Sequence, residues 1–349
     1  MIMKTTKPRY RLLLTAGCAV ILSACGGGGG SGGSSTGTST GTGTPPATQT
    51  SPLTAITSAN STLAANAGYS SGSLLSQTST SVGGVVTGVS VQPAAVGVIT
   101  PVLDLTKRVY TARTSNMLAG VTFTQACTDG GSIRVDASLH SQNTFSNGDT
   151  IVLWVDSCIE NGEYLNGRLS MKVSGVSGDV LGSNTGSVTL AASFDSFAVN
   201  STVGRMSAWV TGDMNIALTA NNATSASLAI SGSSLQLEVL PHGAPAAKFT
   251  LADYTVTGST NGSTVTSAAS FKVSGSSSTL GVFNYTVKNL TPFVYHGAPT
   301  PDAGALTVTG AGSSVTVSAT GGANVRLDYN DGATVQTKTM SWSELLNAF

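Results

Sequence analysis

The sequence predicts a mainly β protein built on a long-stranded antiparallel meander, with a minor helix on the N-terminal side and a short C-terminal helix. Three observations predict it. Apolar residues recur at every second position from about Gly120 onward, tight-turn dipeptides separate these segments, and no helical pattern intervenes between them. Such a meander hides its apolar face by curling into a half-barrel or by stacking as a sandwich, and the sequence leaves both open.

The N-terminus carries a short basic segment followed by an apolar run. Four basic residues and no acidic residue precede Leu12–Ala24. An apolar run of this length is shorter than the roughly 20 residues that a membrane-spanning helix needs. Residues 1–24 are therefore expected to be a secretory signal peptide.

The apolar run ends in Leu22-Ser23-Ala24-Cys25. This tetrapeptide resembles the lipobox of bacterial lipoproteins, and the resemblance implies that Cys25 receives a diacylglycerol thioether and begins the mature chain. It also implies two or three acyl chains, which hold a protein on a membrane stably, whereas one chain binds only reversibly. Gly26 stands where inner-membrane lipoproteins often carry aspartate. In a host with two membranes, the resemblance therefore implies the outer membrane.

Residues 25–52 are the expected lipid anchor and tether. After Cys25 they are almost wholly Gly, Ser, Thr and Pro, without a charged side chain. Such a chain stays flexible because it cannot bury enough surface to offset its ordering entropy, and its typical span is on the order of 30 Å. Removal of the signal peptide leaves 12 Lys+Arg against 16 Asp+Glu, a formal charge of −4. This balance argues against nucleic acid as a partner.

The next segment, residues 53–118, is expected to be transitional and only partly ordered. Leu63–Leu75 and Val98–Tyr110 place apolar residues three or four positions apart, which is typical of short helices. Gly68 and Gly72 weaken the first of these helix predictions, because glycine costs a helix interior about 1 kcal/mol relative to alanine.

The expected β domain, residues 119–349, alternates between apolar and polar residues. Ile133, Val135 and Ala137 alternate with Arg134 and other polar side chains. The same alternation recurs in three further segments: Leu169–Val173, Met206–Leu218 and Leu235–Val239. One apolar face and one polar face are typical of antiparallel strands buried on a single side, and the pattern predicts roughly a dozen strands.

Glycine-containing dipeptides predict the hairpin turns between these strands. They are Asn161-Gly162, Asn166-Gly167, Asn261-Gly262, Gly321-Gly322 and Asp331-Gly332. The last dipeptide belongs to the segment DYNDG, which is similar to a calcium-binding loop. Its second aspartate and its glycine each come one position too early for that ligand set, so a hairpin turn is the better interpretation.

Two cysteines remain besides the cysteine of the signal peptide and the lipidated Cys25, namely Cys127 and Cys158. In an exported protein they are expected to form a disulfide, since two thiolates without nearby histidines make a poor zinc site. A hairpin with its turn near residue 145 places Cys158 opposite Ser132, only a few residues from Cys127. Closing a loop of this size stabilises the fold by roughly 3–4 kcal/mol in the chain-entropy model.

The C-terminal segment begins with Ser341 and Glu344 at capping-box spacing, which predicts the start of a helix. Four apolar residues could then form one stripe that covers part of the sheet: Trp342, Leu345, Leu346 and Phe349. The three tryptophans are interpreted as packing residues of the core or its rim: Trp154, Trp209 and Trp342.

The histidines are the best candidates for chemistry. His242 and His296 each follow an apolar strand end in the repeated tetrapeptide His-Gly-Ala-Pro, which a duplicated strand–turn–strand unit would explain. If the two approached each other, Asp302 or Asp253 could complete a weak metal or acid/base site. Otherwise each histidine ends a strand and bonds its own turn, which is the interpretation we favour. His140 falls on the polar face of its strand and is expected to be solvated.

These observations lead us to expect a membrane-anchored envelope lipoprotein that is not an enzyme and holds no cofactor. It would act as a binding or structural module, with an envelope protein or an apolar ligand as partner. A curled sheet with an apolar interior could hold a lipid, as half-barrel lipoprotein carriers do, by analogy of fold alone. Two alternatives stay open. The first is a surface-exposed adhesion or matrix component with a flat, Thr/Ser-rich outer face, and the second is an envelope hydrolase whose site no motif reveals.

Overall fold

The computed structural model describes residues 52–87, 120–141, 146–160, 163–179, 185–201, 206–222, 224–241, 247–298 and 300–348, which belong to one compact unit, Thr50–Phe349. Several predictions concern residues outside these ranges: the signal peptide, Cys25, the tether, Val98–Tyr110, Asn161-Gly162 and His242.

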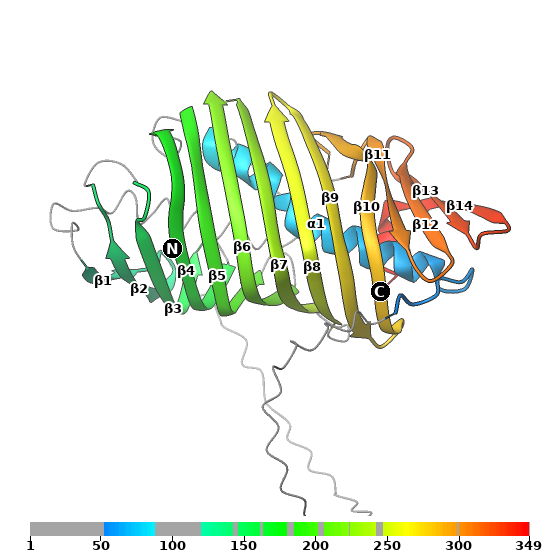
Figure 1. Ribbon diagram of the computed structural model, residues 1–349, viewed down its shortest axis with the longest axis horizontal. Helices are drawn as coiled ribbons and strands as arrows, with labels where there is room; N and C mark the ends of the chain where they lie inside the picture. The colour runs from blue at the N-terminus through cyan, green and yellow to red at the C-terminus, as the bar shows by residue number, and fades with distance from the viewer. Residues whose placement is uncertain are drawn as a thin grey trace, which may run out of the picture. The chain divides into compact units, whose positions relative to one another are not determined.

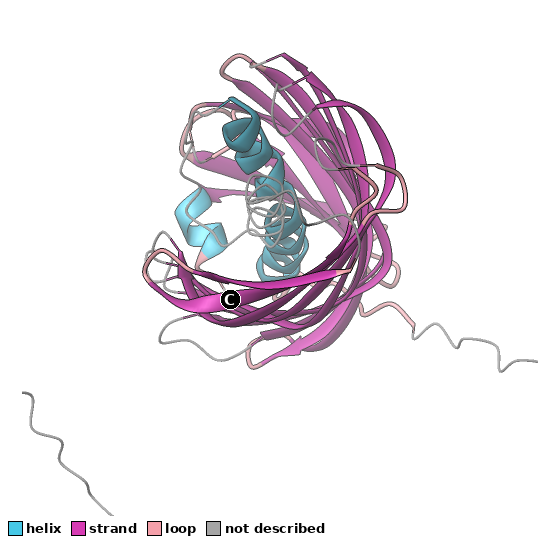
Figure 2. Cartoon of the chain, turned by 90° about the vertical axis from the view of Figure 1, so that its left-hand side faces the viewer, coloured by secondary structure: helices cyan, strands magenta, loops and turns pink. Residues whose placement is uncertain are grey.

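Fourteen strands form a single antiparallel sheet in which each strand pairs with its neighbours in sequence. The strands are β1 (Val121–Ala126), β2 (Gly130–Ser138), β3 (Thr150–Glu160), β4 (Glu163–Asp179), β5 (Thr185–Ser201), β6 (Met206–Asn222), β7 (Ser225–Pro241), β8 (Ala247–Asn261), β9 (Thr264–Ser277), β10 (Gly281–His296), β11 (Ala303–Thr309), β12 (Ser314–Ala319), β13 (Asn324–Asn330) and β14 (Val335–Ser341). The predicted meander is confirmed. Of the two ways to hide its apolar face, the sheet takes the first, because it curls as one layer instead of stacking as a sandwich (Figures 1 and 2).

Helix α1 (Ser61–Thr87) lies on the concave side of this sheet (Figures 1 and 2). It contacts β7–β9 and β11–β13 and is longer than the predicted Leu63–Leu75. The chain between residues 52 and 87 is thus part of the folded body and not only a transitional segment. Within the described segments, no helix combines the length and the hydropathy that crossing a bilayer requires.

The two glycines that seemed to weaken this helix are what let it approach the sheet. A Cβ atom on Gly68 would overlap Cγ2 of Val308 on β11. A Cβ atom on Gly72 would lie 3.2 Å from Cε1 of Phe271 on β9. The missing side chains cost helix propensity, but they allow close packing of the helix against buried strand residues.

Residues 52–56 fasten the start of this helix to the sheet. The amide of Thr54 donates to the carbonyl of Asn284 at 2.9 Å, and its carbonyl accepts from the amide of Ala311 at 3.1 Å. The amide of Ile56 donates to Oγ of Ser313 at 2.9 Å, and its side chain is buried. The segment that enters α1 is therefore held by β10 and by the β11–β12 turn.

Helix α3 (Trp342–Leu346) begins with the predicted capping box. Oγ of Ser341 accepts from the amide of Glu344 at 3.1 Å, and the Glu344 carboxylate accepts from the amide of Ser341 at 2.7 Å. Trp342 and Leu345 are buried as predicted, but Leu346 is 45 % exposed and does not join the stripe. Phe349 lies outside the described residues.

An aromatic cluster joins the two helices to the sheet. The ring of Tyr69 on α1 lies 4.7 Å from that of Trp342 on α3 and 5.4 Å from that of Phe293 on β10, between ring centroids. Asn66 also donates from its side-chain amide to the carbonyl of Leu345. These contacts place α3 against α1 on the concave side.

Register shifts interrupt several strand pairs and give the long strands room to bend. Ser157 on β3 and Ser196 on β5 have positive φ, at 52° and 50°. Each of them faces a glycine on the preceding strand, Gly131 or Gly167, where a Cβ atom would strike the serine carbonyl oxygen. The neighbouring backbone comes so close that only glycine fits.

This geometry corrects one turn prediction. Asn166-Gly167 does not form a hairpin but lies inside β4 at such a register shift, with a φ of 107° at Gly167. The glycine has the positive φ that a turn would need, but a close neighbouring strand requires it here. The turns at Asn261-Gly262, Gly321-Gly322 and Asp331-Gly332 are confirmed.

Candidate functional site

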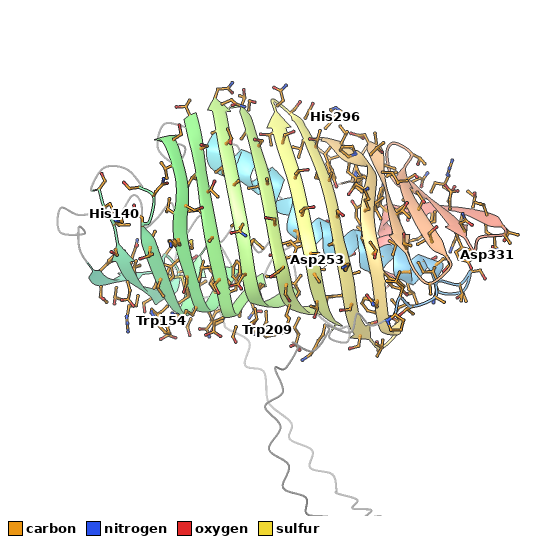
Figure 3. The ribbon with its side chains drawn as sticks, in the orientation of Figure 1. His140, Trp154, Trp209, Asp253, His296 and Asp331 are labelled. Carbon is orange, nitrogen blue, oxygen red and sulfur yellow. A yellow bond between two sulfur atoms is a disulfide. The ribbon has the colours of Figure 1, made fainter. Side chains whose placement is uncertain are left out.

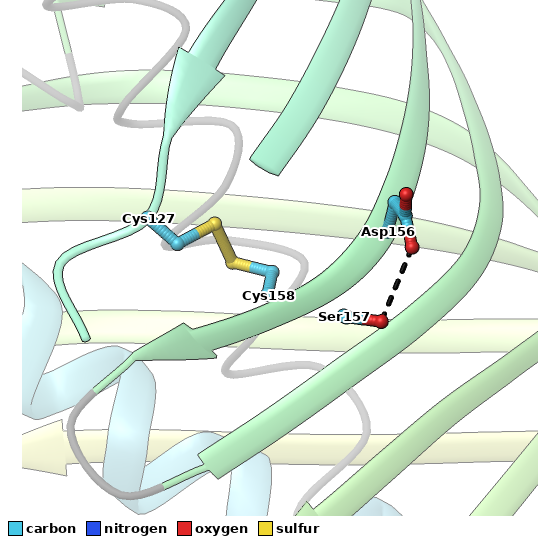
Figure 4. Close-up of a disulfide and its surroundings, with 4 residues drawn as sticks. All are labelled: Cys127, Asp156, Ser157 and Cys158. Carbon is cyan, nitrogen blue, oxygen red and sulfur yellow. Dashed lines mark hydrogen bonds between the residues drawn. A yellow bond between two sulfur atoms is a disulfide. The ribbon is translucent and has the colours of Figure 1, made fainter. Parts of the chain in front are cut away.

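The predicted disulfide joins Cys127, just after β1, to Cys158 on β3, with Cα atoms 5.5 Å apart (Figure 4). The predicted register was wrong by two residues, since Ser132 pairs with Asp156 instead of Cys158. The reason lies in the hairpin connection, since Ser138 pairs with Thr150 and the two strands are therefore centred on position 144 and not on 145. The register shift at Ser157 comes only after the Ser132–Asp156 pair. Cys158 is fully buried, so the bond ties the first strands together from the inner side of the sheet.

The strands that precede the two histidines of the repeated tetrapeptide finish at opposite ends of the sheet. β7 ends at Pro241, directly before His242, and β10 ends at His296. Odd-numbered and even-numbered strands of an antiparallel meander run in opposite directions, so the C-terminal ends of β7 and β10 lie at opposite ends of the sheet. His242 itself lies outside the described residues, but this arrangement does not support a site shared by the pair.

His296 pairs instead with one of its predicted partners. Its Nδ1 lies 2.9 Å from a carboxylate oxygen of Asp302, and both side chains are partly exposed. Asp253, the other candidate, pairs with Lys272 at 2.7 Å and lies on the body of the sheet, away from His296 (Figure 3). Among the described residues, no three His, Cys, Asp or Glu side chains come together as a metal site.

His140 is exposed, as predicted, but it is not merely solvated. Its Nδ1 lies 2.7 Å from the carboxylate of Asp149, which is fully buried. The same carboxylate accepts from the backbone amides of His140 and Ser146, each at 2.8 Å. Asp149 therefore organises the ends of the β2–β3 connection, and His140 covers it.

A cavity of about 10 Å³ lies between α1 and strands β9–β11, with Tyr69, Phe271 and Tyr295 in its lining. That volume accommodates about one water molecule. The described cavity is thus far smaller than the several hundred Å³ of a typical ligand pocket.

The outer face of the sheet is exposed and carries mostly short polar side chains. On β6 the exposed positions include Thr211, Asn215 and Thr219, and on β8 they include Thr255 and Thr257. Side chains at alternate positions share a face, so these residues form flat rows of hydroxyl and amide groups. Charged side chains such as Lys172 on β4 and Asp253 on β8 lie among them.

One group on the outer face differs from its surroundings. Arg134 on β2, Trp154 on β3 and Arg168 on β4 are direct cross-strand neighbours, and we call them the arginine–tryptophan row. The guanidinium carbons lie over the indole ring, 5.6 Å from its centroid for Arg134 and 4.7 Å for Arg168. Trp154 is 42 % exposed and lies toward the β1 side of the sheet (Figure 3).

Asp136 holds Arg134 and Trp154 of this row in place. Its carboxylate accepts from Nη2 of Arg134 at 2.9 Å, from Oγ1 of Thr122 at 2.7 Å and from Nε1 of Trp154 at 3.0 Å. These hydrogen bonds, led by that from Arg134, lower the pKa of Asp136 to about 2. The carboxylate stays charged at neutral pH, and it fixes the orientation of the indole.

Arg168 has no comparable partner. Its Nε is buried and makes no hydrogen bond. Asp195 lies opposite it on β5, but no ion pair joins the two in the described part of the chain. The row therefore offers one guanidinium that forms no ion pair within the described residues.

Sequence reasoning assigned Trp154 to core or rim packing and did not single out this row. The alternation contains the signal that was missed, because Leu153 and Val155 are buried and Trp154 between them must face outward. An aromatic residue out of phase with the apolar face, on the same face as two arginines, marks an exposed cluster.

Comparison with known protein families, with curated proteins and with solved structures finds no match for this chain.

Proposed function

We propose that this protein is a non-enzymatic module of the cell envelope, anchored by lipid at Cys25 and acting through the outer face of its curled sheet. One observation supports the outer face as the acting surface. Helix α1 packs on the concave side with Ala64, Ala65 and Leu75 buried, so the chain itself takes up space that a carrier would keep for cargo. The outer face is then a surface that neither described helix covers (Figure 2).

The anchor follows from the lipobox-like tetrapeptide and is tested by replacing Cys25. Cys25→Ser should move the protein from the membrane fraction to the soluble fraction and abolish incorporation of labelled palmitate. Cys18→Ser is the matched control, since it changes the other cysteine of the same segment and should leave both readouts unchanged. Membrane attachment of the Cys25→Ser protein without cleavage would refute the anchor.

An apolar ligand is the less supported partner, because the described cavity beside α1 holds about 10 Å³. Extraction of the purified protein with organic solvent, followed by mass spectrometry, tests this point. We expect only the acyl chains bound covalently to Cys25. A stoichiometric free lipid would instead support a carrier.

A second candidate is a surface-exposed adhesion or matrix component. The rows of exposed threonine and asparagine on β6 and β8 favour it, since such a flat polar face suits repeated weak contacts. Protease added to intact cells should then cleave the protein. Complete protection until the outer membrane is permeabilised would place the module inside the envelope and exclude this candidate.

A further inference from the structure

We infer that the arginine–tryptophan row is a docking site for a protein partner that presents a carboxylate, from aspartate or glutamate, to Arg168. This inference deepens the proposed function and rests on it, since it names the partner chemistry of the outer face. Four observations support it: the guanidinium of Arg168 without an ion pair, the two guanidinium groups over the indole, the rigidity of the row and the contrast with two paired lysines of the same face.

The charge of Arg168 calls for an anion. Its guanidinium forms no ion pair within the described residues, although Asp195 lies opposite it on β5. The Nε is buried and cannot be reached from outside, so a partner would bind the Nη groups of this half-buried side chain. Asp136 cannot compensate, because its carboxylate already accepts from Arg134, Thr122 and Trp154. A planar guanidinium with free N–H groups binds a carboxylate through paired hydrogen bonds.

The arrangement of the rings favours a protein over a polysaccharide. A sugar would use the face of Trp154 as a platform, but the guanidinium groups of Arg134 and Arg168 already lie over that ring. Trp154 is nevertheless 42 % exposed. Exposed tryptophan and arginine are the residues that most often dominate protein–protein interfaces.

The row is also held rigid before any partner arrives. The Trp154 indole is fixed by the hydrogen bond from its Nε1 to Asp136 at 3.0 Å. The disulfide between Cys127 and Cys158 ties β1 to β3, the strand that carries Trp154. A surface ordered in advance loses less entropy when it binds.

The lysines of the outer face differ from Arg168, although Lys172 and Lys288 are likewise exposed and form no ion pair within the described residues. Lys272 on β9 pairs with Asp253 at 2.7 Å, and Lys248 on β8 pairs with Glu238 at 3.0 Å. Each of these lysines is therefore matched by a carboxylate of the chain. Among these outer-face cations, Arg168 stands apart because it is stacked on an aromatic ring and has no carboxylate partner.

Binding of an acidic peptide tests the inference. The probe is a fluorescently labelled hexaglutamate peptide, and its anisotropy is followed as full-length protein in detergent micelles is added at low salt. We expect saturable binding that weakens at least tenfold in Arg168→Gln and weakens as ionic strength rises. Lys272→Gln is the matched control, since it removes one positive charge from the same face and should bind as the unmodified protein does.

Two further measurements keep the result interpretable. Arg168→Lys retains the charge but not the planar guanidinium, and it should lose most of the binding. This variant tests the site independently if Arg168→Gln folds poorly. Polygalacturonate, a carboxylated polysaccharide, is tested in parallel. Equal or tighter Arg168-dependent binding of polygalacturonate would overturn the choice of a protein partner.

Equal binding of hexaglutamate by the unmodified protein, Arg168→Gln and Arg168→Lys would refute the row as the site. So would the absence of saturable binding by the unmodified protein. Neither result affects the proposed anchor, which depends on fractionation of the Cys25→Ser protein. The two hypotheses therefore fail separately.

Discussion

The contact between Gly68 on α1 and Val308 on β11 tests how the helix is held inside the sheet. Gly68→Ala adds one methyl group at a point where it would overlap Cγ2 of Val308 and lie 3.3 Å from Cγ2 of Val287. Both valines are fully buried. Their branched side chains have few alternative rotamers, so the helix must move away from the sheet.

Two opposing terms set the magnitude. Alanine is favoured over glycine in a helix interior by about 1 kcal/mol, whereas overpacking of a tight core costs about 1–3 kcal/mol. The substitution of Gly68 should therefore lower the free energy of unfolding by about 1 kcal/mol. Val308→Ala removes the overlap, and in that background Gly68→Ala should no longer destabilise. The coupling energy between the two sites is then about 1–3 kcal/mol.

Equilibrium unfolding in urea, followed by circular dichroism, measures all four proteins of this cycle. Gly72→Ala is a graded comparison, because its Cβ atom would lie 3.2 Å from the edge of the Phe271 ring and the overlap is milder. It should cost less than Gly68→Ala. Equal effects of Gly68→Ala in the unmodified protein and in the Val308→Ala background would show that close packing is not why glycine is needed.

Three further predictions concern the disulfide, the helix cap and the outer-face carboxylate. Replacing Cys127 and Cys158 by alanine should lower the free energy of unfolding by about 4 kcal/mol in the chain-entropy model, measured by urea unfolding against the oxidised protein; an unchanged midpoint would contradict this. Ser341→Ala should cost about 1 kcal/mol through loss of the cap, whereas Ser341→Asn, which keeps a capping side chain, should cost little. The Asp136 carboxyl should titrate by NMR at about 2, so its stabilising contribution is present above the unfolded pKa of about 4 and is lost as the pH falls toward 2. Arg134→Gln should raise that pKa, and an unchanged value would refute the assigned cause.

Alternation alone predicted which side of each strand is buried. Ile133 and Val135 are buried while Arg134 between them is exposed, as a period of two requires. The Ser341–Glu344 capping box was equally readable, because both hydrogen bonds join residues three positions apart. Local patterns of this kind need no knowledge of the rest of the chain.

Features that depend on contact between distant segments were not readable. Gly68 would destabilise an isolated helix. Its role in close packing becomes apparent only from its contact with Val308, which lies 240 positions later in the sequence. Gly167 carries the letters of a turn, yet it serves a strand that bends past Ser196. In both cases the unusual position of the glycine was informative. The residue that requires the glycine, however, is distant in sequence and cannot be identified from the local pattern.

The arginine–tryptophan row could not be predicted from the sequence, for a related reason. Alternation places Arg134, Trp154 and Arg168 on the outer face, but it does not say which of them align across strands. That alignment depends on register, and register shifts at Ser157 and Gly167 interrupt the pairing of β3 and β4. A one-residue error in either strand would separate the side chains, so the row could be found only with the strand pairing known.

The free edge of the open sheet bears on where a partner can bind. β14 is the last strand in the sheet order, and Val335 to Thr339 are all exposed. Leu327, buried on β13, pairs with Lys338, and cross-strand partners share a face, so β14 turns a lysine toward the inner side. Adding a further strand here would bury that ammonium group. An inward-pointing charge on an edge strand is a common way in which proteins prevent pairing at a sheet edge. A partner is therefore expected to contact the outer face, where Trp154 and Arg168 are already exposed in part, and not to extend the sheet through β14.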